Sequence, residues 1–371
     1  MTLTYLIMIK HILPANMSTS KLFQTIIVVV VIAFAMGLTG CAQQSTEKER
    51  KIERSFYYWK SVFSITDYER KAIADLNIST LYLKFFDVDW DKLSHQPLPI
   101  AQVRIKEPEI LNKNFKSIIP TVFITNNCIR NIDSLQAIEL GVKISTLVNK
   151  ICYANQIAFT EIQIDCDWTA LTKENYFILL ESIKKHQPIN KKISATIRLH
   201  QIKYSNKTGI PPVDRGLLMA YNMGNLKDPS SNNSILESKE LKKYISNLLS
   251  YPLLLDVGLP LFEWKILFRN NIYAGLIENL PDHFLNTKVI KKISENRFKF
   301  LNDTVLNGYS FLKEDILRKE ESIFDEIVAA ERILTQNLPA KDIRLSLFHL
   351  DSLILKKYTV HEMEVIFNGL H

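Results

Sequence analysis

Residues 159–168 read Phe-Thr-Glu-Ile-Gln-Ile-Asp-Cys-Asp-Trp, a short run in which polar and apolar side chains alternate. Alternation with a period of two is typical of a β-strand, because successive side chains point to opposite faces. One face then carries Gln163, Asp165 and Asp167, and the other carries Ile162, Ile164, Cys166 and Trp168. In a parallel barrel the apolar face packs under the helices, and the polar face points into the barrel mouth.

Strand-like runs also lie on both sides of this stretch and alternate with amphipathic helical runs. In chain order, the predicted strands are Ser55–Phe63, Thr80–Phe86, Ser117–Ile124, Phe159–Asp167, Lys192–His200, Gly216–Asn222, Tyr251–Gly258 and Arg344–Leu350. The predicted helices are Thr66–Leu76, Ser134–Tyr153, Lys173–Lys185, Ser238–Leu249, Ser322–Gln336 and Thr359–Leu370. This order predicts parallel βαβ units in the α/β class, and eight strands close a (β/α)8 TIM barrel. An open doubly wound sheet is the alternative, but no glycine-rich phosphate loop follows the first strand.

The alternation is interrupted between the seventh predicted strand and the helix predicted at Ser322. This interval holds two β-rich runs, Arg297–Leu306 and Tyr309–Arg318, which are joined by Asn307-Gly308. Asn-Gly favours a tight hairpin because both residues tolerate positive φ. We therefore expect a small β-hairpin-containing insertion after strand 7, at about residues 264–320, within a barrel that spans residues 55–371.

The beginning of the sequence has the pattern of an export signal. The apolar run Ile26–Leu38 is about a dozen residues long, which suits a signal peptide better than a membrane span of about 20 residues. It ends in Leu-Thr-Gly-Cys41, a string that resembles the lipobox of bacterial lipoproteins. The resemblance implies that residues 1–40 are removed, that Cys41 is lipidated and that residues 41–54 form a tether. A single-pass anchor that is never cut is the alternative.

The resemblance to lipoproteins also implies a location. Ala42, rather than Asp, follows the cysteine, and by the usual sorting rule this favours the outer membrane over the inner one. We therefore expect a lipid-anchored protein of the cell envelope.

Composition narrows the possible partners. The formal net charge is +7, from 46 Lys and Arg against 39 Asp and Glu, and the basic residues form no block, so nucleic acid is not an expected partner. Three cysteines follow Cys41, namely Cys128, Cys152 and Cys166, without a Cys-x-x-Cys pair. We expect buried free thiols, no metal site, no cofactor and a monomer.

Polar residues near the carboxyl ends of several predicted strands are candidates for a ligand site, because active sites of such barrels lie at that face. Besides the two aspartates of strand 4, the candidates are Gln163, Lys84, Arg198, His200, Tyr221, Asn222, Asp256 and Trp264. Lys84 and Asp256 each stand alone in an apolar run, so they could instead form a buried ion pair with each other.

Asp165 and Asp167 form a pair suited to acid catalysis. Their α-carbons are expected to lie roughly 6.5 Å apart on one face of the strand. Repulsion between two carboxylates in a partly dry site leaves one protonated and the other ionised, as acid-catalysed sugar cleavage requires. Because Asp167 lies nearer the mouth, we expect it to keep the shared proton. Acids that merely cap the next helix are the alternative.

Three segments together resemble glycoside hydrolase family 18, the group of chitinases and endo-β-N-acetylglucosaminidases. The fourth strand of that family carries Asp-x-x-Asp-x-Asp-x-Glu, and its last three positions match Gln163, Asp165 and Asp167. The sixth strand carries Met-x-Tyr followed by Asp or Asn, as in residues 219–222, and the seventh ends in Gly-x-Pro and an aromatic residue, as in residues 258–262. Residues 165–169 and 221–224 are also similar to an uncharacterised group of barrel lipoproteins.

The resemblance implies a retaining glycosidase that acts on a glycan. In the family the substrate's N-acetyl oxygen attacks the anomeric carbon, an Asp orients this amide and a Tyr supports it, which are roles for Asp165 and Tyr221. Asp167 would be the acid/base, although it stands where the family has the longer Glu. Because the family also contains sugar-binding members that lost the acid, a non-catalytic glycan-binding lipoprotein is the alternative. A purely structural envelope protein is a more distant one.

Overall fold

The computed structural model describes residues 50–188, 190–277, 280–339 and 341–371. The predicted signal peptide, the lipidation site Cys41 and most of the predicted tether lie outside the described residues. Among the helices that are described, none is long and apolar enough to span a membrane.

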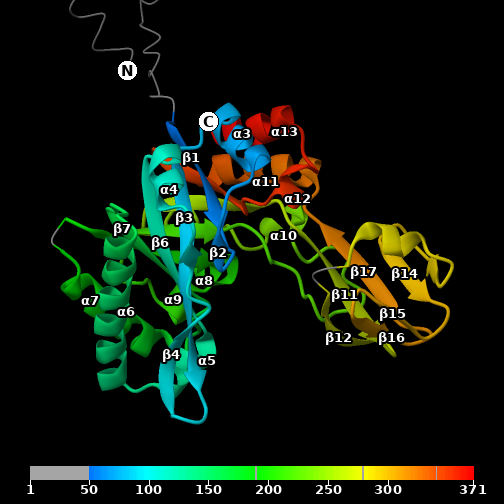
Figure 1. The fold of residues 1–371 in the computed structure, drawn as a ribbon, viewed down its shortest axis with the longest axis horizontal. Helices are drawn as coiled ribbons and strands as arrows, with labels where there is room; N and C mark the ends of the chain where they lie inside the picture. The colour runs from blue at the N-terminus through cyan, green and yellow to red at the C-terminus, as the bar shows by residue number, and fades with distance from the viewer. Residues whose placement is uncertain (1–49, 189, 278–279, 340) are drawn as a thin grey trace, which may run out of the picture. The chain divides into compact units, whose positions relative to one another are not determined.

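Eight parallel strands form a closed barrel (Figure 1). They are β1 (Ile52–Tyr58), β3 (Thr80–Asp91), β6 (Ser117–Ile124), β7 (Glu161–Cys166), β8 (Lys192–Arg198), β9 (Arg215–Met219), β10 (Leu255–Pro260) and β18 (Ile343–Phe348). The barrel closes because β1 pairs on one side with β18 and on the other with β3. This pairing confirms the predicted (β/α)8 barrel and excludes the open sheet.

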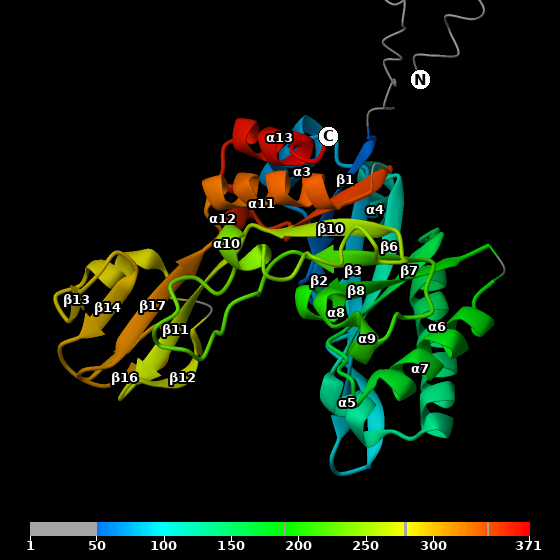
Figure 2. The same ribbon diagram turned by 180° about the vertical axis from the view of Figure 1, so that it is seen from behind.

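Amphipathic helices cover the outside of the barrel (Figures 1 and 2). The longer ones are α3 (Asp67–Asp75), α6 (Ser134–Ala154), α7 (Lys173–His186), α11 (Phe324–Asn337) and α13 (Val360–Asn368). At the start of α6, Asp133 accepts a hydrogen bond from the backbone N–H of Gln136, whose side chain accepts one from Asp133 in return. This capping box satisfies two donors and explains why the helix begins there.

Several predicted elements end earlier than expected, among them the fifth strand and the helix predicted after the sixth strand. The strand predicted to run to His200 stops at Arg198, whose backbone N–H donates to the Gln201 side chain as the short helix α8 (Leu199–Lys203) begins. The helix predicted over 238–249 is only α10 (Ser238–Leu241). Beyond it the Asn247 side chain donates to the Lys203 backbone carbonyl instead of supporting another helical turn.

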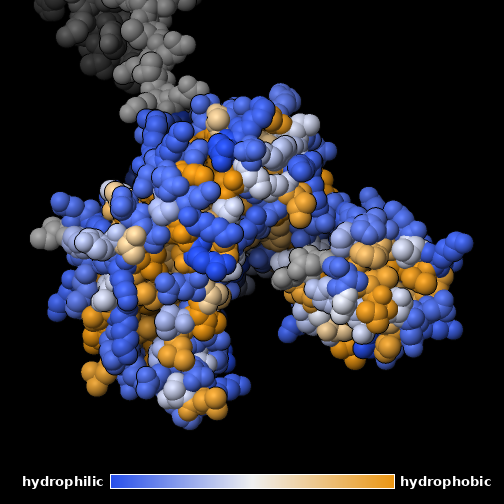
Figure 3. Space-filling view, viewed as in Figure 1, coloured by the Kyte–Doolittle hydropathy of each residue, from blue (hydrophilic) through white to orange (hydrophobic). Residues whose placement is uncertain are grey.

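The segment between β10 and α11 forms a separate five-stranded sheet with its own apolar core (yellow to orange in Figure 1). Its strands, in spatial order, are β12 (Ile272–Ile277), β11 (Glu263–Arg269), β17 (Ile316–Glu321), β14 (Arg297–Phe300) and β13 (Ile290–Lys292). The predicted hairpin is confirmed: β15 (Thr304–Leu306) and β16 (Tyr309–Phe311) pair across Asn307 and Gly308, with φ of 48° and 84°. Figure 3 shows apolar residues interspersed with polar ones on the surface.

Candidate functional site at the barrel mouth

A hollow of about 650 Å³ lies at the carboxyl ends of the barrel strands, where active sites of this fold occur. Its volume is within the range of about 300–1,000 Å³ that is usual for small-molecule sites. The residues used below that line it are Trp59, Phe123, Asp165, Asp167, Arg198, Tyr221, Asn222, Phe262, Glu263, Trp264, Phe348, His349, Asp351 and Lys357. Asp165, Asp167, Arg198, Tyr221, Asn222 and Trp264 are thus brought together, as the sequence predicted.

Strand β7 has the predicted alternation. Gln163 lies inside the barrel, where its side-chain oxygen accepts a hydrogen bond of 2.5 Å from the Tyr57 hydroxyl. Trp168 is fully buried on the opposite, helix-facing side, where its ring stacks on Tyr176 with the ring centres 5.1 Å apart. Gln163 therefore lies in the barrel core below the hollow, and Trp168 is a core residue rather than a sugar platform.

Asp165 is the buried member of the acid pair. Its side chain is 4% exposed, and one oxygen accepts a hydrogen bond of 2.6 Å from the Thr196 hydroxyl. Burial raises the pKa of this carboxyl to about 6, and the negative charge of Asp167 adds to the rise while Arg198 opposes it. Asp165 therefore takes up a proton at a higher pH than an ordinary aspartate does.

Asp167 is half-exposed and held by a cation. The Arg198 guanidinium donates to both of its oxygens, through Nε to Oδ1 and through Nη2 to Oδ2 at 3.0 Å. Such a two-pronged contact occupies both oxygens of the carboxylate and fixes its orientation. The sequence predicts that Asp167 keeps the shared proton, whereas the carboxyl whose pKa is raised is that of Asp165. The sequence pattern did not reveal that Arg198 pairs with Asp167.

Tyr221 and Asn222 follow β9, the sixth strand of the barrel, and line the hollow at its mouth. Tyr221 is 2% exposed, burial raises the pKa of its hydroxyl, and this hydroxyl has no hydrogen-bond partner among the described residues. Asn222 is exposed at the rim with a φ of 53°, and its backbone N–H donates to the Ile235 carbonyl. Tyr221 thus offers an unused donor and acceptor inside the hollow.

Lys84 and Asp87 form an ion pair within β3, with 3.0 Å between Nζ and Oδ2. Lys84 also lies 5.5 Å from the ring centre of Trp59, and Asp87 is close enough to Asp165 to raise its pKa. Residues three apart in a regular strand face opposite ways, but the register of β3 shifts between Lys84 and Phe86. This bulge turns both side chains inward, and sequence parity could not have predicted it.

Two predicted site residues lie elsewhere. His200 is an exposed residue of α8, because the strand ends before it. Asp256 is 1% exposed near the start of β10 and pairs with Arg215 and Arg344. The predicted pair between Lys84 and Asp256 is therefore wrong, since both residues have nearer partners of opposite charge.

Aromatic side chains line one wall of the hollow. Phe262 contacts Trp264, Tyr221 and Phe348, with ring centres 5.2–5.9 Å apart, and Trp59 lies 5.7 Å from Phe348. Phe348 and its neighbour His349 were not predicted as site residues, although both lie within the predicted strand Arg344–Leu350. Burial lowers the pKa of His349 to about 4, so this ring is neutral at physiological pH.

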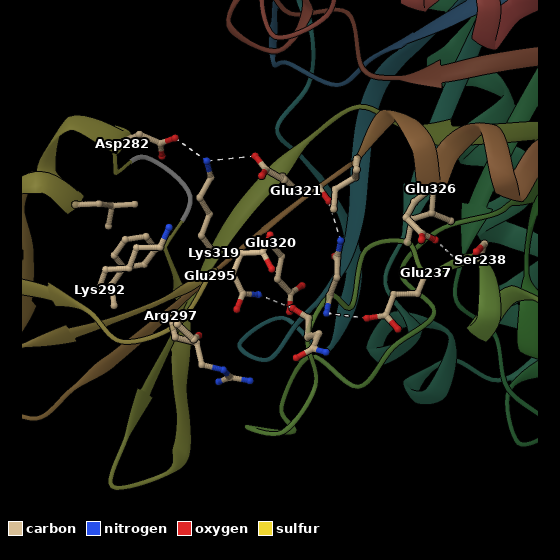
Figure 4. A pocket seen from close by; sticks show the side chains of 18 of the residues that line it. Glu237, Ser238, Asp282, Lys292, Glu295, Arg297, Lys319, Glu320, Glu321 and Glu326 are labelled. Atoms are coloured by element: carbon tan, nitrogen blue, oxygen red, sulfur yellow. Dashed lines mark hydrogen bonds and ion pairs between the residues drawn. The ribbon is translucent and has the colours of Figure 1, made fainter.

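A second hollow, of about 1,020 Å³, lies between the β9–α10 loop and the insertion (Figure 4). Its charged groups are largely paired with one another. Lys319 contacts Asp282 at 2.7 Å and Glu321 at 3.2 Å, and Glu326 accepts a hydrogen bond from the Ser238 backbone (Figure 4). We therefore take the barrel mouth, which has unpaired polar atoms, as the candidate site.

The described part of the chain contains three cysteines and other residues of the types that bind metal ions. Cys128, Cys152 and Cys166 are buried and free, as predicted. No group of three or more His, Cys, Asp or Glu residues within the described ranges is arranged to hold a metal ion.

Comparisons with known proteins identify the fold. No family model matches the sequence, and no curated protein matches it. The C-terminal domain of a putative chitinase from Desulfitobacterium hafniense has a TM-score of 0.53 at 10% identity, over 87% of this chain and 100% of that one. A chitinase from Bacteroides thetaiotaomicron has a TM-score of 0.51 at 11% identity, over 86% and 97%.

A third solved structure is similar over a smaller share of its length. The spore cortex-lytic enzyme SleL from Bacillus megaterium has a TM-score of 0.51 at 14% identity, over 87% of this chain and 74% of that one. This chain thus has the barrel fold of chitinases and related enzymes, as the resemblance to family 18 implied. At these identities the likeness establishes the fold alone.

Proposed function

We propose that this protein binds a glycan at the mouth of its barrel, and that binding rather than hydrolysis is the function that the geometry supports best. The ion pair between Asp167 and Arg198 carries the proposal. A general acid must hold a proton that it can give to the leaving oxygen of a glycoside. Because Arg198 donates to both oxygens of Asp167, the carboxyl at the position of the acid is already engaged and is not free to hand a proton to a leaving oxygen.

The lining of the hollow supports a sugar as the ligand. Trp59, Phe262, Trp264 and Phe348 offer aromatic surface for the apolar faces of sugar rings. The Tyr221 hydroxyl, which lines the hollow and lacks a partner among the described residues, can bind a sugar hydroxyl or amine group. An aromatic pocket with a few convergent polar groups is typical of a small-molecule site. The barrels with the same fold include proteins named chitinases.

A retaining glycosidase is the second candidate, and a specific observation favours it. Asp165 has a pKa of about 6 through burial and lines the same hollow as Tyr221. In the family that the sequence resembles, residues at these positions orient and support the N-acetyl group that attacks the anomeric carbon. Hydrolysis would then require Arg198 to release Asp167 when the substrate binds, so that Asp167 can act as the acid/base.

We also propose that the protein is a lipoprotein of the cell envelope, anchored in the outer membrane rather than the inner one. The support is the string Leu-Thr-Gly-Cys41 after an apolar run, with Ala42 following the cysteine. A lipid anchor would hold the barrel at a membrane surface, where envelope or external glycans are within reach.

One screen separates binding from hydrolysis. The full chain, purified in mild detergent, is tested against labelled glycans for binding and for turnover, beside Asp167→Asn and the surface control Asp75→Asn. We expect at least one glycan to be bound and none to be cleaved. Turnover by the wild type that falls about 10²–10⁴-fold in Asp167→Asn, but not in the control, would instead establish the glycosidase. If no glycan is bound, both candidates fail.

A further inference from the structure

The inner mouth of the barrel holds more acid than base. Asp165 and Asp167 line this region, and Asp87 lies near enough to Asp165 to raise its pKa, whereas the cations here among the described residues are Lys84 and Arg198. Lys84 contacts Asp87, and Arg198 contacts Asp167. Asp165 receives a neutral hydrogen bond from Thr196, and no ion pair in the described part of the chain includes it. One negative charge is therefore left without a cation of its own.

The outer rim does not supply the missing cation. Glu263 lines the same hollow and pairs with Lys357, Lys265 and Lys319. Asp351, also on the rim, pairs with Lys60 at 2.5 Å. The rim lysines are thus engaged by rim acids, so the excess negative charge remains in the inner mouth.

Unpartnered polar atoms point to a ligand in the same place. One buried oxygen of the Asp87 carboxylate has no hydrogen-bond partner among the described residues. The hydroxyl of Tyr221, a residue that is 2% exposed, also has no such partner. A buried polar group left unpaired destabilises the folded protein, so a ligand that supplies hydrogen-bond partners is favoured there. The Trp59 ring lines the same hollow, with the Lys84 ammonium 5.5 Å from its centre.

We infer that the ligand is an amino sugar with a free, protonated amine, and that Asp87 and Asp165 hold this ammonium group in the barrel mouth. The inference rests on the proposed glycan binding and names its substrate class. An ammonium offers three donors and one positive charge, which match the unpaired oxygens and the excess negative charge. An N-acetylated amine brings no charge and only one donor. A uronic acid would add a negative charge where one is already in excess.

The probes are two β-1,4-linked tetramers of equal length, one of glucosamine and one of N-acetylglucosamine. Binding of each to the full chain in mild detergent is measured by calorimetry at neutral pH, at low and at high salt. We expect the wild type to bind the glucosamine tetramer at least about tenfold more tightly, a difference of about 1.4 kcal/mol. High salt should narrow the difference, because it screens charge attraction.

Matched variants assign the contact. Asp87→Asn should lower the affinity for the glucosamine tetramer about tenfold and leave that for the acetylated tetramer within about twofold. Asp89→Asn removes the same charge two residues along the strand, where the carboxylate accepts from Thr125, and should change neither affinity. An equal loss of affinity for the glucosamine tetramer in both variants would show that any nearby negative charge has this effect. It would overturn the assignment of the contact to Asp87.

The comparison of the two tetramers uses the wild type alone, so it does not depend on whether a variant folds. If the wild type binds the acetylated tetramer as tightly or more tightly, the amino-sugar inference is wrong while the proposed glycan binding stands. If it binds neither tetramer but binds another glycan in the screen described above, only the inference fails. If it binds no glycan at all, the proposed function fails with it.

Discussion

The buried carboxylate of Glu320 accepts a hydrogen bond of 2.7 Å from the indole N–H of Trp264, a wall residue of the barrel mouth. The same oxygen accepts from the backbone and hydroxyl of Ser234, on the loop after β9, at 2.9 and 2.5 Å. Its other oxygen lies 2.7 Å from the fully buried Arg318, which donates to backbone carbonyls of that loop. Glu320 therefore links the insertion, the loop and the aromatic wall.

Replacing Glu320 with Ala should destabilise the protein strongly. The change leaves the Arg318 charge buried without its carboxylate and removes the acceptor of the Trp264 and Ser234 donors. Breaking one side of a buried ion pair typically costs about 3–5 kcal/mol. We expect a loss of this size in the free energy of unfolding, measured by urea denaturation.

The control is the exposed pair of Lys71 and Asp75 on α3, which lies on the helix surface. Lys71→Ala should cost less than about 1 kcal/mol, as is usual for surface pairs. A Glu320→Ala variant that is no less stable than this control would show that Glu320 does not link these three parts.

The barrel could be predicted because its pattern is local. The predicted strand Ser117–Ile124 has the bounds of β6, and the hairpin at Asn307-Gly308 follows from two residues that accept positive φ. The early end of β8 was not predictable in the same way, because it depends on a hydrogen bond from the Arg198 backbone to Gln201.

The site was predicted where it depends on parity and was missed where it depends on pairing. Parity brings Asp165 and Tyr221 to the same hollow. The inward position of Asp87 depends on the bulge in β3, and the ion pair of Asp167 depends on Arg198 in the next strand. The alternation of polar and apolar residues in a single strand reveals neither a bulge nor a partner on another strand.

Replacing Glu331 with Gln should stabilise the protein at neutral pH. Glu331 is 1% exposed on α11, its two carboxyl oxygens lack hydrogen-bond partners among the described residues, and burial raises its pKa to about 9. In the unfolded chain the pKa of Glu is about 4.3. Its contribution to stability is therefore complete below about pH 4 and is lost as the pH rises toward 9. We expect Gln to add on the order of 2–4 kcal/mol at neutral pH.

The pH dependence makes this prediction specific. Near pH 4 the Glu331 carboxyl is neutral in both states, so Glu331→Gln and the wild type should unfold with the same free energy in urea. A gain that is equal at pH 4 and at neutral pH would mean that packing against α13, rather than ionisation, causes the effect.

Cys41 should carry lipid, because it ends a lipobox-like string. Cells that express the full chain and are fed an alkyne fatty acid should label the wild type but not Cys41→Ala. Cys152→Ala is the control, since that thiol is buried in the barrel and its loss should leave labelling intact. Equal labelling of wild type and Cys41→Ala would contradict the lipoprotein proposal.

Replacing Arg198 with Gln should raise the pKa of Asp165 further above 6. The Arg198 charge is the largest influence that opposes the effect of burial on this carboxyl, and its removal also frees the negative charge of Asp167 nearby. An opposite charge at this range typically shifts a pKa by about 1–3 units, so we expect a rise of at least about one unit. This rise is measured by NMR, from the carboxyl signals of ¹³C-labelled aspartate followed over pH and assigned with Asp165→Asn.

The control is Arg215→Gln, which removes the partner of Asp256 instead and should leave the pKa of Asp165 unchanged. If the pKa of Asp165 stays at about 6 without Arg198, then the Arg198 charge does not oppose the effect of burial on this carboxyl.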